Sequence, residues 1–183
     1  QGDFTYWTSK LNRKEVINKM AYITPLYGFR TKYGYCNAAF LTAGEIIPKV
    51  TGKSWEEIIK EKIVTPLGMK RTFMLSEDLK KINNVAVPHT IVAGKILKIP
   101  YPMIDNLAPA GSMSASAKDM CHWLMAQLDS GRIENKKIIP YEAIFATRVP
   151  QIVVKSDQRE KVKSHFYLYG LGFLINDRDG KIV

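Results

Sequence analysis

Apolar side chains recur every three or four residues in two long stretches of this chain, a period that predicts two amphipathic helices. The first covers residues 38–49; Pro48 is expected to kink or end it, and Gly52 to close it. The second covers residues 117–129, and Gly131 ends it. The side chains expected to face the core are Phe40, Ala43, Ile46, Ile47 and Val50 in the first helix, and Met120, Cys121, Leu124, Met125 and Leu128 in the second.

Capping signals predict where the shorter helices begin. Asn12 and Ser54 are each followed three residues later by a glutamate, Glu15 and Glu57, which is the pattern of a capping box. We therefore expect one helix to begin after Asn12 and another after Ser54, the second ending before Pro66. Short helices are also expected at residues 76–82, capped by Ser76, and at residues 141–148, which follow Pro140.

Strand patterns lie between and after these helices. Residues 85–88 and 95–99 are expected to form two short strands joined by a turn. Residues 167–175 are apolar on both alternating faces, which predicts a strand buried on both sides. Residues 177–180 predict a hairpin turn that leads into a returning strand. Because the chain stops inside that hairpin, we expect it to be a segment of a longer protein.

Composition is that of a soluble globular protein. The chain has 183 residues, of which 46% are hydrophobic and 24% charged, enough for one domain with one sizeable core. No apolar run reaches the roughly 18 to 20 residues that a membrane helix needs, and no signal-peptide pattern is present. We expect no membrane partner. The sequence does not fix the compartment of the parent protein, for which a periplasmic or extracellular location is favoured.

The net charge of +10 raises the possibility of nucleic-acid binding. The lysines instead form scattered pairs, often with glutamates between them, and the densest cluster, at residues 155–163, includes Asp157 and Glu160. This pattern indicates a solvated surface, and we expect no nucleic-acid partner. A nucleic-acid binder remains the alternative, which tight, salt-sensitive binding would reveal.

The cysteines and histidines give no sign of a metal site. Cys36 and Cys121 are far apart in apolar surroundings, so we interpret them as two buried free thiols. The three histidines, His89, His122 and His165, lack metal-ligand spacing. We expect no metal and no cofactor.

Tyr35 and Asn37 stand two residues apart, directly before the helix predicted at residues 38–49, so both polar groups are placed where a loop meets a helix. Three further motifs follow this Tyr-x-Asn pair in a fixed order. They are Thr51-Gly52-Lys53-Ser54-Trp55, Pro66-Leu67-Gly68-Met69 and Pro109-Ala110-Gly111.

Together these motifs resemble the β-lactamase-related serine hydrolases of the class C β-lactamase, CubicO peptidase and D-aminopeptidase type, over nearly the whole chain. The resemblance implies a fragment of the α+β fold of β-lactamases and transpeptidases. Residues 1–166 would form most of its helical lobe, and residues 167–183 the start of its antiparallel sheet.

The resemblance also implies a reaction, the hydrolysis of an amide or ester through a serine acyl-enzyme without a metal. Tyr35 would be a catalytic residue that shuttles a proton together with a lysine. A phenol has a free pKa near 10, so it needs a nearby cation to act as a base. Asn37 would orient that lysine or the substrate amide, and is expected to be a substrate-binding residue.

Two other motifs of that family are absent from the sequence. No serine is followed by a lysine three residues later, and no Lys-Thr-Gly, Lys-Ser-Gly or His-x-Gly occurs. We therefore expect this chain to be the inactive middle segment of an enzyme whose substrate is a small molecule or a peptide. D-amino-acid peptidase, esterase, β-lactamase and transpeptidase activities stay open, with the resemblance favouring the first two.

The missing segments also lead to an expectation about self-association. Their absence would leave apolar surface and a strand edge exposed, so the chain is expected to self-associate. The alternative to an enzyme is a binding or scaffold protein that keeps the helical lobe without its chemistry.

Overall fold

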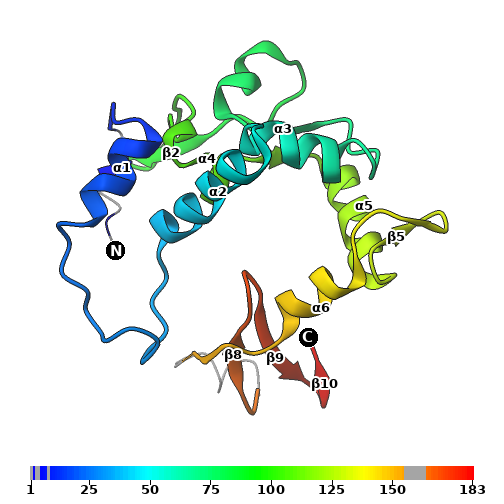
Figure 1. Ribbon diagram of the computed structural model, residues 1–183. Coiled ribbons are helices and arrows are strands. Elements are labelled where there is room, and N and C mark those ends of the chain that lie inside the picture. Colours follow the sequence, from blue (N-terminus) through cyan, green and yellow to red (C-terminus); the bar gives the residue numbers. More distant parts are fainter. Residues whose placement is uncertain (1, 3–4, 8, 155–163) are drawn as a thin grey trace. The chain divides into compact units, whose positions relative to one another are not determined.

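The computed structural model describes residues 2, 5–7, 9–154 and 164–183, and Figure 1 shows their helices and strands. The chain divides into two compact units. One comprises Gln1–Ile23 and Cys36–His122, and the other Thr24–Tyr35 and Trp123–Val183. The predicted lysine cluster at residues 155–163 lies outside the described residues.

The first unit is mainly helical and carries two small antiparallel ladders. The ladders pair β1 (Thr72–Phe73) with β4 (Ser114–Ala115), and β2 (His89–Val92) with β3 (Lys95–Lys98). The helical elements are α1 (Arg13–Met20), α2 (Asn37–Thr51), α3 (Trp55–Ile59), the π-helix η2 (Lys60–Val64), the 3₁₀ helices η3 (Ser76–Lys81) and η4 (Asp105–Leu107), α4 (Ala108–Gly111) and the start of α5 (Ala117–Leu128).

Local capping decides where α1 and α3 begin, and both predicted capping boxes are confirmed. The Asn12 Oδ1 atom accepts a hydrogen bond from the backbone N–H of Glu15 at 3.0 Å. Ser54 Oγ accepts one from Glu57 N at 3.2 Å. Each glutamate also accepts a bond from the backbone N–H of its capping residue, so two otherwise unpaired donors are satisfied at each helix start.

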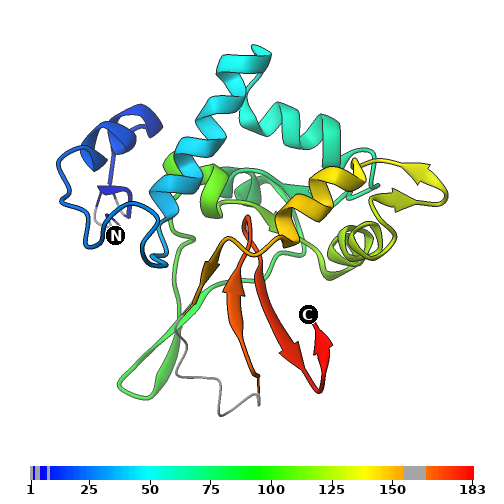
Figure 2. The same ribbon diagram turned by 60° about the horizontal axis from the view of Figure 1, so that its bottom comes forward.

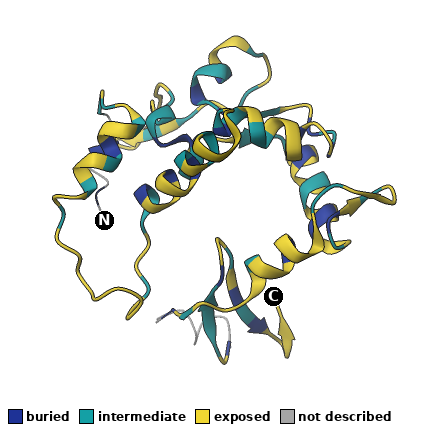
Figure 3. Ribbon diagram, in the orientation of Figure 1, coloured by how far each residue is buried: buried dark blue, intermediate teal, exposed yellow. Residues whose placement is uncertain are grey.

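The α2 helix ends at Thr51, two residues beyond the predicted end at Lys49, and continues through Pro48. Gly52 closes it as predicted, with a φ of 72°, the left-handed cap that favours glycine. Its buried face consists of Ala38, Leu41 and Gly44 (Figure 3). The predicted core stripe was wrong, because its members Phe40, Ile46 and Val50 are exposed.

The reason is the close packing of α2 on α4. A Cβ atom added to Gly44 would lie only 2.3 Å from Pro109 Cβ, so this face of α2 approaches its neighbour more closely than a larger side chain allows. The small residues therefore face inward and the bulky ones outward. The core of the unit forms next to this contact from Tyr6, Val16, Leu41 and Leu107.

The start of the 3₁₀ helix η3 depends on a distant residue. We expected Ser76 to cap it, but Ser76 makes no capping bond of its own. Instead, the carboxylate of Asp105 accepts hydrogen bonds from Ser76 N at 2.7 Å and Glu77 N at 3.1 Å, and also from the Ser76 hydroxyl. Asp105, in η4, thus bonds to the start of η3, which joins the two ends of the segment that contains the β2–β3 hairpin. We call this contact the Asp105 clasp.

That hairpin begins later than predicted. Its first strand is β2, from His89 to Val92, rather than residues 85–88. Ala93 and Gly94 form its two-residue turn with positive φ values of 48° and 76°, the geometry that joins tight hairpins. The second strand, β3, agrees with the prediction to within one residue.

The face of α5 that packs was also predicted wrongly. Met120, Cys121, Leu124, Met125 and Leu128 are exposed, whereas Asp119, Ala126 and Gln127 are buried. Asp119 sets this orientation in the first turn, because its carboxylate accepts bonds from Arg71 N at 2.7 Å and Thr72 Oγ1 at 2.8 Å. Ser116 caps the start of this helix, since its Oγ accepts a bond from Asp119 N at 3.1 Å.

The second unit contains the rest of α5, one further helix and two antiparallel sheets (Figure 2). The larger sheet has the strand order β10-β9-β8-β7, all antiparallel. The elements are β5 (Arg132–Ile133), β6 (Lys136–Lys137), α6 (Tyr141–Arg148), β7 (Ile152–Val153), β8 (Tyr167–Tyr169), β9 (Leu174–Arg178) and β10 (Lys181–Ile182).

The single strand predicted at residues 167–175 is two strands, β8 and β9, joined by a turn. Gly170 N donates to Phe173 O at 2.8 Å, which closes the turn. A Cβ atom on Gly170 would lie 2.2 Å from the carbonyl oxygen of Thr147, so the strand breaks where the backbone must pass close to α6. The predicted turn before β10 is confirmed, with Asp179 and Gly180 at positive φ.

The sheet also includes Ile152–Val153, which lies before Tyr167 in the chain. The predicted division into a helical lobe of residues 1–166 and a sheet from residue 167 stays a prediction.

Among the described residues, no helix is both long and apolar enough to cross a membrane.

Candidate active site

The start of α2 holds the side chain of Asn37. Cys36 precedes the helix in an extended conformation, and Asn37 occupies the first helical position. The carboxamide Nδ2 of Asn37 donates a hydrogen bond to the phenol oxygen of Tyr6 at 2.9 Å. Because Tyr6 is only 2% exposed, this bond ties a half-buried polar group to the core of the first unit.

Tyr6 is itself fixed from two sides. Its ring packs in the core with Leu41 of α2 and Leu107 of η4. Its backbone carbonyl accepts a hydrogen bond from Asn106 Nδ2 at 3.2 Å, and the same amide also donates to Leu11 O at 3.1 Å. The N-terminal segment therefore forms a rigid support behind Asn37. Sequence reasoning missed Tyr6, because no local pattern indicates a contact across 31 positions.

Tyr35 belongs to the second unit, since the boundary between the units falls between Tyr35 and Cys36. Its side chain is 60% exposed, so it is not packed in the interior. The two predicted site residues, Tyr35 and Asn37, thus belong to different units, and the contacts of each are those within its own unit.

The surroundings of Tyr35 are two further tyrosines, Tyr33 and Tyr169. The rings of Tyr33 and Tyr169 lie 5.0 Å apart between centroids and are tilted by 55°. Burial, and then the neighbouring phenol of Tyr35, raise the pKa of Tyr33. Burial is also the main cause of the raised pKa of Tyr169, followed by the Tyr33 and Tyr35 phenols. The Tyr33 and Tyr169 phenols beside Tyr35 therefore stay protonated to a higher pH than an isolated tyrosine.

These two tyrosines were also missed from the sequence. Tyr33 and Tyr35, like Tyr167 and Tyr169, are spaced by two residues, the spacing that places side chains on one face of an extended segment. That repeat is the signal that could have drawn attention to the cluster.

A second polar cluster in this unit contains serine, histidine and aspartate. Asp177 Oδ2 lies 2.5 Å from His165 Nδ1, and Asp177 Oδ1 accepts bonds from Ser164 Oγ at 3.0 Å and His165 N at 2.6 Å. The hydrogen bond from His165 is the largest cause of the lowered pKa of Asp177, and the same bond raises the pKa of His165.

This cluster is not a nucleophilic triad. The Ser164 hydroxyl contacts Asp177 and the carbonyl of Phe166 rather than the imidazole, so the histidine is not placed to activate it as in a Ser-His-Asp triad. Asp177 acts here as a structural acceptor that ties the segment before β8 to β9.

The cysteines differ from their predicted environment. Cys36 is half-buried and Cys121 is exposed, so neither is the buried thiol that we expected. In the described part of the chain, no three His, Cys, Asp or Glu side chains lie in positions to hold a metal ion together.

Comparisons with known proteins identify the family. The profile of the family described as Beta-lactamase matches residues 1–182. Penicillin-binding protein 4 of Amycolatopsis lactamdurans is 29% identical over 105 residues, which cover 55% of this chain and 27% of that protein. An unguisins hydrolase of Aspergillus campestris is 25% identical over 118 residues, covering 63% of this chain and 22% of that protein.

Solved structures agree with this match. The octameric penicillin-binding protein homologue from Pyrococcus abyssi is 25% identical with a TM-score of 0.76, and covers 93% of this chain and 37% of that one. A D-stereospecific amidohydrolase from Streptomyces sp. shares the fold, with a TM-score of 0.73 at 17% identity, over 100% of this chain and 51% of that chain.

The chain therefore spans about a quarter of the curated relatives and between 37% and 51% of these solved chains. The predicted α+β fold of β-lactamases and transpeptidases is confirmed, and so is the predicted resemblance. With a family match over residues 1–182, this chain belongs to the beta-lactamase family.

Proposed function

We propose that this chain supplies the second catalytic motif, Tyr35-x-Asn37, of a serine hydrolase that cleaves amide or ester bonds through a covalent acyl-enzyme. The observation that carries the proposal is the carboxamide of Asn37, which the core residue Tyr6 holds at the first position of α2. A family match over residues 1–182 supports the same conclusion.

In the proposed reaction, the oxygen of a serine bonds to the substrate carbonyl carbon while its proton passes to Tyr35 and a neighbouring lysine. The leaving amine or alkoxide takes up that proton as its bond to the carbonyl carbon breaks. Water then repeats both steps, which releases the acid and regenerates the serine. Asn37 orients the lysine or the substrate amide through its carboxamide oxygen, since its nitrogen donates to Tyr6.

The serine and lysine of this scheme would come from a Ser-x-x-Lys motif, which this sequence does not contain. The chain alone is therefore proposed to be inactive. We favour a small amide, peptide or ester substrate, because the similar proteins include a D-stereospecific amidohydrolase and a D-amino acid amidase solved with D-phenylalanine.

Two measurements test this proposal. The chain by itself should neither react with a fluorophosphonate probe nor hydrolyse a chromogenic ester. In the full-length gene product, Tyr35→Phe should lower kcat about 100-fold or more, because the phenol proton is lost from the transfer. Tyr22→Phe is the matched control and should leave kcat unchanged, since Tyr22 is a highly exposed tyrosine with no role in the proposed reaction.

The proposal is overturned if Tyr35→Phe retains full activity in an active gene product. If the full-length product is also unreactive toward the probe, the alternative of a non-catalytic binding or scaffold protein takes its place.

A further inference from the structure

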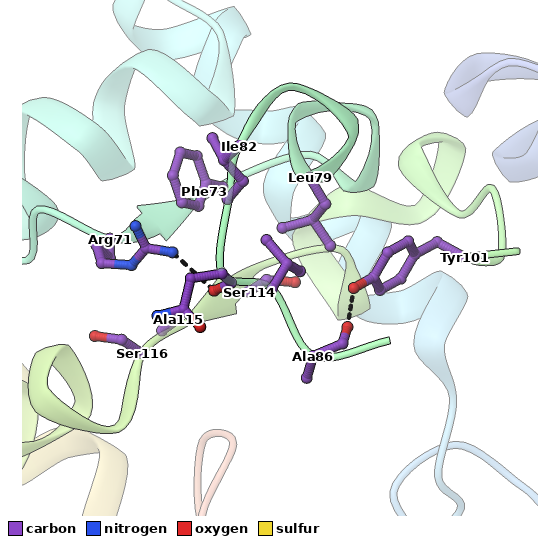
Figure 4. A pocket seen from close by; sticks show the side chains of 11 residues that line it. Arg71, Phe73, Leu79, Ile82, Ala86, Tyr101, Ser114, Ala115 and Ser116 are labelled. Atoms are coloured by element: carbon purple, nitrogen blue, oxygen red, sulfur yellow. Dashed lines mark hydrogen bonds between the residues drawn. The ribbon is translucent and has the colours of Figure 1, made fainter. Parts of the chain in front are cut away.

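The first unit contains a cavity of about 430 Å³ that the proposed hydrolase chemistry does not use (Figure 4). Its volume falls within the range of about 300–1,000 Å³ that is usual for small-molecule sites. Neither Tyr6 nor Asn37 lines it. The lining residues that matter for its chemistry are Arg71, Phe73, Leu79, Ile82, Tyr101 and Ser114.

Most of the wall is apolar and is held in place by neighbouring structure. Phe73 lies in β1 opposite Ser114 in β4, so the short ladder forms one side. Leu79 extends from η3 and is almost fully buried. Tyr101 is fixed by its hydroxyl, which donates to the carbonyl of Ala86 (Figure 4). The apolar part of a ligand could therefore contact two aromatic rings of this wall, those of Phe73 and Tyr101.

The one charged group in the lining is the guanidinium of Arg71. Its Nη2 donates to the carbonyl oxygens of Asn83 at 2.9 Å and Asn84 at 3.0 Å, which hold the side chain against the cavity. Over the residues that the structure describes, no carboxylate forms an ion pair with Arg71, and its Nε and Nη1 have no hydrogen-bond partner. The cation therefore keeps N–H groups for an incoming anion.

Further donors stand beside this cation. The hydroxyl of Ser114 has no hydrogen-bond partner within the described part of the chain. Ser116 Oγ accepts a bond from Asp119 N at 3.1 Å, so its own O–H can still donate. Asp119 itself is buried, does not line the cavity, and is occupied by Arg71 N and Thr72 Oγ1.

We propose that this cavity binds a small organic carboxylate with an aromatic or branched apolar body. The carboxylate pairs with Arg71 and accepts a hydrogen bond from Ser114, because an arginine without an acidic partner favours an anion. The apolar body contacts Phe73, Leu79 and Tyr101. Inorganic phosphate fits less well, since it would leave the apolar wall in contact with water.

Calorimetric titration of the 183-residue chain with 3-phenylpropionate tests the proposal. The matched ligand 3-phenylpropanamide has the same apolar body but no charge, and inorganic phosphate has charge but no such body. We expect 3-phenylpropionate to bind about tenfold more tightly than either, the ratio expected from one charge-assisted hydrogen bond or from burial of the ring. Ring signals of Phe73 and Tyr101 should shift in NMR spectra on binding.

Variants of the chain add a second test. Arg71→Gln should weaken 3-phenylpropionate about tenfold while leaving the amide unchanged, and Arg71→Lys should recover part of the loss. Arg132→Gln, which alters an exposed arginine of the second unit, is the control and should bind as the original chain does. If Arg71→Gln fails to fold, the comparison of the three ligands on the unaltered chain still decides the matter.

Equal affinity for the carboxylate and the amide would overturn the role of Arg71. Equal affinity for phosphate and 3-phenylpropionate would show that the cavity binds anions without using its apolar wall, and would overturn the proposed contact with an apolar ligand body. Binding that shifts other ring signals, but not those of Phe73 and Tyr101, would place the ligand elsewhere and overturn the assignment.

Discussion

At the scale of single residues, the candidate site depends on contacts that join distant parts of the sequence. Asn37 was chosen as a candidate site residue because it stands in a Tyr-x-Asn pair at the start of a helix, and that role stays a prediction. Its partner Tyr6 was not chosen, because only the folded chain brings the two together. Tyr33 and Tyr169 were missed for the same reason. Short motifs thus indicate candidate groups for the chemistry, whereas the residues that support those groups follow from tertiary packing.

The His165–Asp177 pair gives a prediction for pH dependence. The pKa of His165 is raised above its usual 6.5, so the stability that it adds is present below about pH 6.5 and is lost as the pH rises through the higher folded value. The pKa of Asp177 is lowered from 3.8, so its contribution is present above about pH 4 and is lost as the pH falls. The pair should therefore stabilise the second unit most between about pH 4 and 6.5.

Thermal midpoints measured from pH 3 to pH 8 check this expectation. Asp177→Asn keeps an oxygen for Ser164 but removes the charge, and should flatten both limbs of the profile. His165→Gln should remove the alkaline limb and reduce the acid limb, because the bond from His165 is the largest cause of the lowered pKa of Asp177. A profile of Asp177→Asn with the same shape as that of the original chain would count against the pair.

At the scale of elements, helix starts were easier to predict than helix faces. The caps at Asn12 and Ser54 were right because each depends on residues three positions apart. The inward faces of α2 and α5 were wrong because neighbours decide them: Pro109 admits only a glycine at position 44, and Asp119 turns α5 toward β1. Hydrophobic periodicity finds a helix, but a close contact can select small or polar residues for its packed side.

Gly44→Ala tests the contact between α2 and α4. The added methyl group would lie 2.3 Å from Pro109 Cβ, so the helices must move apart or strain. We expect a loss of about 1–3 kcal/mol in the free energy of unfolding, measured by urea denaturation.

Gly34→Ala is the matched control, because no atom lies within 4 Å of the added Cβ there. That variant should be neutral or slightly stabilising, since alanine reduces the freedom of the unfolded chain. An equal loss in both variants would show that the α2–α4 contact is not the cause.

At the scale of the whole molecule, family and fold could be predicted from the order of four motifs, and both are confirmed. The break between β8 and β9 could not, because it depends on Gly170 passing close to the Thr147 carbonyl. Large apolar side chains also remain exposed, among them Leu124, Met125 and Leu128, the last of which is 84% exposed. An apolar strip of this kind favours association.

We therefore propose that the chain self-associates through α5. Sedimentation equilibrium should show a mass that increases with concentration. Leu128→Glu should shift the chain toward monomer, because a carboxylate in an apolar contact is costly. Val50→Glu places the same charge at an exposed position on α2 and should have no such effect. A monomer at every concentration would contradict the proposal.

The clasp formed by Asp105 has a consequence for how this scaffold tolerates change. Because its carboxylate joins the start of η3 to η4, the two ends of the intervening segment are fastened independently of what lies between them. We therefore expect the β2–β3 hairpin to tolerate changes in length and sequence without loosening the framework that carries it.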